Sequence, residues 1–453
     1  MTTVADLHRA YRDGVTTPTA VAERFLAADP VVGTLASFRA VDADDVMAQA
    51  AASTTRWGDG APVGPLDGVL VGIKDFFAVR GYRTFGGTRA LSVHGEAEAT
   101  LVTRLRAAGA IIAGKTHTTE LGLSPTGTNT AQPTPRNPHD LTRLPGGSSS
   151  GTGAAVAAGL VTAGVGSDGG GSIRIPAATC GVFGHKPSWD LVPTDGSMHV
   201  GWFSLDHVGP LARSTADLVT MVEVLADTRL PVSDAPLRWG VDWSWWGTPD
   251  PAVDGPCRAV AAELRPTEVA LDRVDLAPVA GYVTAISELV AGMWEVLDEQ
   301  PDALSPDVVT AMAQAPNITG ADYVRAQQVR AALADSFAAV FADVDVLVVP
   351  TVAVPAPARP TDQELSAGVL DSDLIAAMTA YTFPANLCGL PAASVPVGVT
   401  QGSGSWPRGL PVGLQVIGPR GGDAMVLSAC AALERAGLAV RPHPVAEHAT
   451  LDP

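Results

Sequence analysis

The stretch that decides the fold lies between residues 145 and 187 and holds two clusters of glycine and serine. The first reads Gly146-Gly-Ser-Ser-Ser-Gly151, and the second reads Ser167-Asp-Gly-Gly-Gly-Ser-Ile-Arg174. Consecutive glycines tolerate the positive φ angles that point several N–H groups at one spot. A serine nucleophile needs such donors for the oxyanion of its tetrahedral intermediate. Flexible turns whose serines cap helices would use the same residues, so either cluster alone leaves both interpretations open.

A serine nucleophile also needs a base, and the chain is short of obvious ones. None of its nine histidines lies in a G-x-S-x-G elbow. Of 29 basic residues only three are lysines, Lys74, Lys115 and Lys186. Arginine stays charged, whereas a buried lysine can lose its proton and then accept one. The sequence therefore favours a serine–lysine arrangement, a known variant of the serine–histidine triad.

Composition limits the classes of function. Apolar residues make up 46% of 453 residues, which supports a large core and excludes global disorder. The formal charge of 29 − 47 = −18 argues against a nucleic-acid or anionic-membrane surface. Four scattered cysteines without a C-x-x-C pair indicate neither a zinc site nor a disulfide framework. The N-terminus lacks a signal-peptide pattern, and residues 154–166 are too few to span a bilayer. We therefore expect a cytoplasmic protein.

Helical and strand patterns alternate along the chain, which predicts an α/β fold. The expected helices are 20–26, 99–108, 154–160, 255–264, 282–297, 323–341 and 424–436. The expected strands are 68–75, 110–113, 268–274, 345–350 and 412–417. The cluster of tryptophans between Trp239 and Trp246 predicts either core packing or a substrate-pocket wall, with core packing slightly favoured.

Two segments match nucleotide-binding motifs in sequence but lack the secondary structure that those motifs require. Gly109 to Thr116 satisfies G-x4-G-K-[ST], but a helix precedes the first glycine, and Ala-Ile-Ile-Ala fills the loop positions with strand-forming residues. Gly151-Thr-Gly-Ala-Ala-Val156 approaches a dinucleotide fingerprint but lacks the preceding strand and the later acidic residue. A nucleotide-dependent enzyme that uses Lys115 therefore remains a rival hypothesis with weak support.

The run from Pro145 to Pro187 resembles the signature of the amidase signature family. The resemblance extends to Gly68–Asp75, Asp206–Arg213, Thr382–Pro391 and Leu410–Gly418, in the family's order. It implies one α/β domain over residues 1–453, with a large twisted mixed sheet covered by helices on both faces. Its expected parts are an N-terminal helical segment (1–60), a catalytic core (68–215), a variable substrate-pocket region (237–342) and C-terminal core strands with a helix (343–453).

The resemblance also implies a Ser–Ser–Lys triad. Ser172 matches the nucleophile, Ser148 the bridging serine that follows a cis peptide bond, and Lys74 the base. The N–H groups of Gly169, Gly170, Gly171 and Ser172 match the oxyanion hole. The matching supporting positions are Ser149, Ser167, Asp168 and Arg174. Lys115 and Lys186 also stand where the family tends to have lysine, and we interpret both as structural.

Several residues depart from the family's pattern. Ser150 and Thr152 replace a common Gly and Ser, and Gly169 stands where Thr or Ile is common, which we expect to widen substrate entry. Ile175 and the segment His185–Asp190 differ from the glutamine-dependent tRNA amidotransferase subunit.

The resemblance therefore implies an amidase that hydrolyses a non-peptide carboxamide, linear or cyclic, through a serine acyl-enzyme. It implies no metal and no cofactor. The expected partner is a small-molecule amide, with no nucleic acid or membrane and with a homodimer by family analogy. The alternative is an amidotransferase subunit that works with a partner chain. Which amide is cleaved does not follow from the sequence.

Overall fold

A computed structural model describes residues 3–94, 97–198, 202–367, 371–402 and 409–444. Within them, eleven strands form one sheet in the order β1-β5-β2-β6-β8-β7-β12-β13-β11-β9-β10. The strands of this sheet are β1 Phe38–Ala40, β2 Leu70–Lys74, β5 Ile111–Thr116, β6 Ala163–Ser167, β7 Phe183–Lys186, β8 Val208–Ala212, β9 Trp239–Val241, β10 Thr267–Glu268, β11 Val346–Pro350, β12 Ala392–Val399 and β13 Pro411–Ile417. A separate hairpin joins β3 Arg83–Thr84 to β4 Val93–His94.

The sheet is mixed, as predicted. Strand β2 lies between β5 and β6 and is parallel to both. The central strands β8, β7, β12 and β13 pair antiparallel, whereas β9 is parallel to both β10 and β11 at the other edge. The sequence alternation of strand and helix thus predicted the class, and the family resemblance predicted the mixed sheet.

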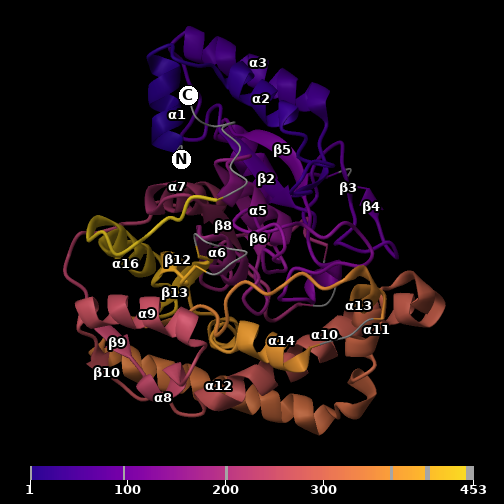
Figure 1. The fold of residues 1–453 in the computed structure, drawn as a ribbon, viewed down its shortest axis with the longest axis vertical. Helices are drawn as coiled ribbons and strands as arrows, with labels where there is room; N and C mark the ends of the chain where they lie inside the picture. Colours follow the sequence, from indigo (N-terminus) through magenta and orange to yellow (C-terminus); the bar gives the residue numbers. More distant parts are fainter. Residues whose placement is uncertain (1–2, 95–96, 199–201, 368–370, 403–408, 445–453) are drawn as a thin grey trace.

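Helices cover both faces and both ends of the sheet. They are α1 Val4–Arg12, α2 Pro18–Ala27, α3 Ala43–Gly58, α4 Thr100–Ala107, α5 Ser150–Ala158, α6 Arg174–Cys180, α7 Thr215–Ala226, α8 Trp243–Trp246, α9 Pro251–Leu264, α10 Ala277–Glu299, α11 Pro306–Met312, α12 Gly320–Asp343, α13 Asp362–Ser366, α14 Ser372–Thr379, α15 Phe383–Leu387 and α16 Asp423–Arg435. Figure 1 shows α1–α3 at one end of the long axis and α8, α9 and α12 at the other.

The two faces of β2 enter different cores. Val71 and Ile73 pack in the core that includes residues of α4, α7, α9 and α16, whereas Leu70 packs with α5 and α6. Because side chains alternate along a strand, Lys74 points to the same face as Leu70, toward α5 and α6. The side chain of Lys74 therefore lies on the face of the sheet that is covered by α5 and α6, the helices that follow the two Gly/Ser clusters.

Most expected elements are confirmed, and three differ. Helix α5 begins at Ser150, four residues before the expected start, because the small residues of the first cluster continue into its first turn. The expected strand 268–274 is wrong: β10 ends at Glu268, and a 3₁₀ turn follows from Val274. Strand β5 runs through Lys115 to Thr116, so Gly109 to Thr116 forms no phosphate-binding loop.

Two tryptophans of the cluster, Trp245 and Trp246, pack against other aromatic and polar side chains. Trp246 is fully buried, and its Nε1 donates to Asp254 at 2.8 Å. Trp245 lies edge-on to Phe337 and Tyr381. The core-packing interpretation is therefore the one that the structure favours.

In the part of the chain that the structure describes, one helical stretch, Val274–Val296, is long and apolar enough to cross a membrane by length and composition. Half of its most apolar window is buried inside the molecule, where it packs on α12 and α15. Core helices commonly have this composition.

Candidate active site

Lys74 is the last residue of β2, and its amine is surrounded by hydroxyls. Its Nζ donates to Oγ of Ser148 at 2.7 Å and to Oγ of Ser167 at 2.9 Å, and the side chain is fully buried. Within the described residues, no carboxylate forms an ion pair with it. Burial lowers the pKa of Lys74 to about 8, and the charges of Asp206 and Asp168 oppose that shift. The site therefore favours a neutral amine more than water does.

Ser148 reaches this amine from the turn that precedes α5. The Gly147–Ser148 peptide bond is cis, as the family resemblance implied. No side chain fits at Gly147, since a Cβ there would lie 2.5 Å from the carbonyl oxygen of Ser124. The next residue, Ser149, donates its N–H to the carbonyl oxygen of Ser172 at 3.2 Å. That bond fastens the first Gly/Ser cluster directly to the second.

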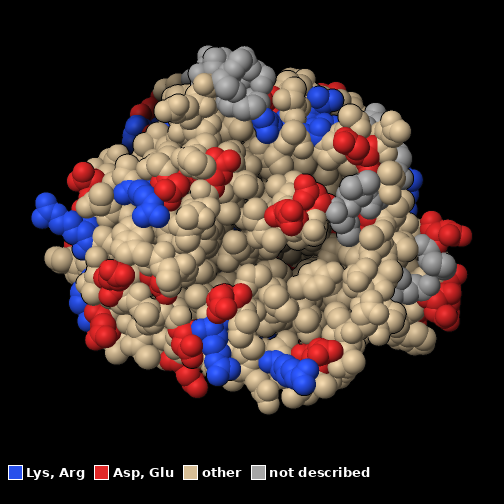
Figure 2. Space-filling model, turned by 60° about the horizontal axis from the view of Figure 1, so that its bottom comes forward, with Lys and Arg blue, Asp and Glu red and all other residues tan. Residues whose placement is uncertain are grey.

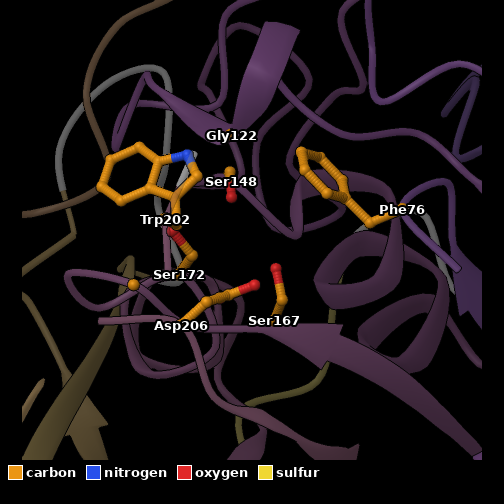
Figure 3. A pocket seen from close by; sticks show the side chains of 8 residues that line it. Phe76, Gly122, Ser148, Ser167, Ser172, Trp202 and Asp206 are labelled. Atoms are coloured by element: carbon orange, nitrogen blue, oxygen red, sulfur yellow. The ribbon is translucent and has the colours of Figure 1, made fainter. Parts of the chain in front are cut away.

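Ser172 stands between β6 and α6, in the same pocket as Ser148 and Ser167, the two serines that contact the Lys74 amine. It shares a pocket of about 220 Å³ with Phe76, Gly122, Ser148, Ser167, Gly169, Trp202 and Asp206. In Figure 3, the hydroxyls of Ser148 and Ser172 face this space, with Trp202 and Phe76 on opposite sides. No direct hydrogen bond joins the two hydroxyls in the structure. The structure thus brings the three predicted triad residues together. Lys74 is hydrogen-bonded to Ser148, whereas Ser148 and Ser172 share the pocket without a hydrogen bond between them.

Backbone amides converge beside Ser172, although not all four that were predicted. Among the described residues, the N–H groups of Gly169, Gly170 and Ser172 have no acceptor. The N–H of Gly171 instead donates to Oδ1 of Asp168 at 2.7 Å. This corrects the expectation for Gly171, because a donor held by a carboxylate is not free for an oxyanion.

Asp168 and Arg174 form the buried frame of the second cluster. Arg174 pairs with Asp168 at 2.8 Å, and its guanidinium also reaches the side-chain oxygens of Asn386 and Gln415. Despite burial, the Arg174 charge and the Asn386 amide hold the pKa of Asp168 far below its usual range. The glycine loop is therefore tied to α15 and β13, more than 200 residues later in the chain.

The other two lysines make structural contacts, as expected. Lys115 pairs with Asp75 at 2.9 Å and donates to the carbonyl oxygen of Phe77 and to Thr84 Oγ1, both at 2.7 Å. Lys186 donates to the carbonyl oxygen of Pro187 at 2.9 Å. Neither lines the pocket of Ser172.

The expectation that Gly169 widens substrate entry is wrong, because Trp202 occupies the space. A Cβ on Gly169 would lie 2.9 Å from Cε3 of Trp202. The indole is fixed by a 2.9 Å hydrogen bond from its Nε1 to the carbonyl oxygen of Leu121. Trp202 thus takes the place of a side chain at position 169.

Sequence reasoning missed several pocket residues. Phe76, Gly122, Trp202 and Asp206 line the pocket, and none comes from the region 237–342 that was expected to build it. Two of them could have been suspected, since Phe76 follows the lysine strand closely and Asp206 opens a segment that resembles the family. The described residues contain no group of three or more His, Cys, Asp or Glu placed to hold a metal ion.

Comparisons with known proteins show what the whole chain is similar to. The sequence model of the family described as Amidase matches residues 20–427. The chain is 33% identical to a fatty acid amide hydrolase of Arabidopsis thaliana, over 95% of this chain and 76% of that protein. It is 34% identical to a glutamyl-tRNA(Gln) amidotransferase subunit of Chloroflexus aurantiacus, over 89% of each chain. A crystal structure of an amidase superposes with a TM-score of 0.85 and 32% identity, over 96% of this chain and all of that one.

Proposed function

Because the chain belongs to the amidase family, it is an enzyme that hydrolyses amide C–N bonds, and we propose that Lys74, Ser148 and Ser172 carry out this reaction. The observation that carries the proposal is the 2.7 Å contact between the buried Lys74 amine and the Ser148 hydroxyl. A lysine held by hydroxyls can exist uncharged and can pass a proton through them.

The first step is attack by Ser172 on the substrate carbonyl carbon. The Ser172 proton passes to Oγ of Ser148, whose own proton passes to Nζ of Lys74, so the amine becomes an ammonium. Collapse of the tetrahedral intermediate breaks the C–N bond, and the proton returns along the same path to the leaving nitrogen. Water then repeats the sequence on the acyl-enzyme and releases the acid.

The oxyanion of each tetrahedral intermediate requires fixed donors. The N–H groups of Gly169, Gly170 and Ser172 are available for it, whereas that of Gly171 stays with Asp168. Such preorganised donors act without reorganising at the moment of reaction. Asp168 and Arg174 support them by holding the loop, Ser149 links the two clusters, and Ser167 orients the lysine.

The pocket favours a compact group next to the reacting carbon. Phe76, Trp202 and Gly169 enclose a small space beside Ser172, and its volume of about 220 Å³ includes room that is open to solvent. A second pocket of about 510 Å³ shares Trp202 and Asp206 with it. A non-peptide carboxamide with a small group at the carbonyl and a larger group extending into this neighbouring space fits the shape.

The remaining expectations concern partners and location. A formal charge of −18 fits a small-molecule substrate better than a polyanion. Figure 2 shows a hollow on one face with acidic side chains at its rim. A cytoplasmic enzyme without a nucleic-acid or membrane partner, and a homodimer by family analogy, complete the proposal.

The test is a pair of serine substitutions assayed with a panel of amides. Ser172→Ala should abolish release of amine and the mass increase of the acyl-enzyme. Ser150→Ala is the matched control, because the Ser150 hydroxyl lies in the same region, is buried and has no hydrogen-bond partner. Turnover by Ser172→Ala at the normal rate would reject the proposal.

The second candidate function is that of an amidotransferase subunit. The 34% identity over 89% of both chains to such a subunit favours it. Purified chain that releases amine only when a partner protein and tRNA are added would establish this alternative. Turnover by the chain alone supports the free-standing amidase.

A further inference from the structure

Asp206 is a carboxylate that the proposed relay leaves unused. It lies two residues before β8 and lines the pocket together with Ser148, Ser167 and Ser172. Among the described residues lining that pocket, it is the only one with an ionisable carboxylate or amine. Its backbone N–H donates to the carbonyl oxygen of Trp202 at 3.0 Å, which fixes its position.

The Ser167 hydroxyl lies between this carboxylate and the lysine. It accepts a hydrogen bond from Nζ of Lys74 at 2.9 Å, so its own proton is free to point elsewhere. In Figure 3, the Asp206 carboxylate points toward the Ser167 hydroxyl. Lys74 and Asp206 form no direct ion pair in the structure, so the amine stays available to Ser148.

Resting on the proposed function, we infer that Asp206 is a positioning residue that stabilises the ammonium formed when Lys74 takes up the relayed proton. It acts through the Ser167 hydroxyl and through its charge. The proton leaves Ser172 for Ser148, and the Ser148 proton joins Lys74, while Asp206 gives up and takes up no proton and, above its pKa of about 7, is a carboxylate. In serine–histidine–aspartate enzymes the aspartate stabilises the imidazolium in the same manner.

The electrostatics of the pair support this role. Burial raises the pKa of Asp206 to about 7, and the charge of Lys74 opposes the rise. Burial lowers the pKa of Lys74 to about 8, and the charge of Asp206 opposes the fall. Each group therefore favours the charged form of the other, and removing one changes the titration of its partner.

Other charged or titratable groups lie near this pair. Asp168, at the end of β6, is held ionised by Arg174 of α6, which lowers its pKa. His207 is buried with a strongly lowered pKa, and its Nδ1 contacts the carbonyl oxygen of Leu205. Burial also lowers the pKa of Lys186 on β7. The pKa values of Lys74 and Asp206 themselves lie near neutrality.

The test is the pH dependence of kcat/KM for Asp206→Asn. Without the carboxylate, the pKa of Lys74 falls, so the acid limb should move to lower pH by about one unit. The plateau of kcat should drop about tenfold or more, because the ammonium loses its stabilising charge and the amine becomes a weaker base. KM should change little.

The controls separate this role from a general effect on folding. Asp206→Glu keeps the charge and should restore the acid limb. Asp217→Asn is the matched control. Burial raises the pKa of Asp217, on helix α7, to about 6, but this residue does not line the pocket. The acid limb of the kcat/KM profile of Asp217→Asn should therefore stay in place. If Asp206→Asn does not fold, Asp206→Ser provides the same measurement.

The inference is overturned if Asp206→Asn or Asp206→Ser folds and the acid limb of its kcat/KM profile stays in place or moves to higher pH. An inactive Ser172→Ala alongside that result leaves the proposed function standing. A Ser172→Ala variant with normal turnover would overturn both.

Discussion

Two buried lysines on neighbouring strands show what makes a lysine a base. Lys74 on β2 lies beside Thr116 in the register, and Lys115 on β5 lies beside Ile73, so the two amines point to opposite faces of the sheet. Both are fully buried. Lys115 meets a carboxylate, Asp75, at 2.9 Å, whereas Lys74 meets two hydroxyls, Ser148 and Ser167.

The difference lies in the partner, not in the burial. Burial lowers the pKa of both amines. A carboxylate in contact restores the charge and holds the ammonium in place. A hydroxyl serves either form, because it can accept from an ammonium or donate to an amine. One side of the sheet therefore has an ion pair that stabilises the fold, and the other side has an amine that can exchange a proton.

The largest expected effect is on activity, when the amine at position 74 is lost. Lys74→Met should lower kcat/KM at least about 10³-fold, because no group remains to accept the relayed proton. Lys74→Arg should be similarly inactive, since a guanidinium stays charged. The measurement is amine release by protein whose thermal unfolding matches wild type. Substantial turnover in Lys74→Met would show that the hydroxyl-held lysine is not the base.

The next effect is on stability, when the amine at position 115 is lost. Lys115→Met should lower the free energy of unfolding by up to about 3–5 kcal/mol, because the buried Asp75 then keeps only Arg39, at 3.5 Å, as a charged partner. Chemical denaturation measures this loss, and the folded fraction should keep kcat near wild type. Adding Asp75→Asn should recover part of the stability. If Lys115→Met instead folds normally and loses turnover, the two lysines have been assigned the wrong way round.

The comparison also predicts the pH profile. Lys74 must be uncharged to accept a proton, and its pKa lies near 8. As the pH falls below about 8, the amine becomes protonated, and kcat/KM should fall about tenfold per unit. Lys115→Arg should leave this limb in place, because it keeps the charge beside Asp75. An activity that stays constant from pH 8 to pH 5 would contradict a neutral-lysine base.

The sequence indicated much of this site because its chemistry is concentrated in short motifs. Lys74, Ser148 and Ser172 lie in stretches whose glycines leave no room for other residues, as at Gly147. Lys115 could be interpreted as structural because strand-forming residues precede it. The buried strands β11 and β13 were recognisable from continuous apolar runs.

What the sequence did not indicate depends on how distant segments meet. Trp202 fills the space at Gly169 from a loop more than 30 residues later. The N–H of Gly171 is held by the Asp168 carboxylate, a choice made by backbone geometry rather than by residue type. The strand expected at 268–274 failed because apolar alternation near a sheet edge also suits a turn that leads into a helix.

The smallest expected effects come from removing one hydroxyl beside each lysine. Ser167→Ala leaves Lys74 bonded to Ser148 alone, and kcat/KM should fall about tenfold, which corresponds to one hydrogen bond to a charged group. Thr84→Val leaves Lys115 paired with Asp75 and should cost about 1–3 kcal/mol of stability with turnover within about twofold of wild type. Matched kinetics and denaturation of the two variants test whether hydroxyls tune chemistry on one face and stability on the other. A larger loss of turnover in Thr84→Val than in Ser167→Ala would break that division.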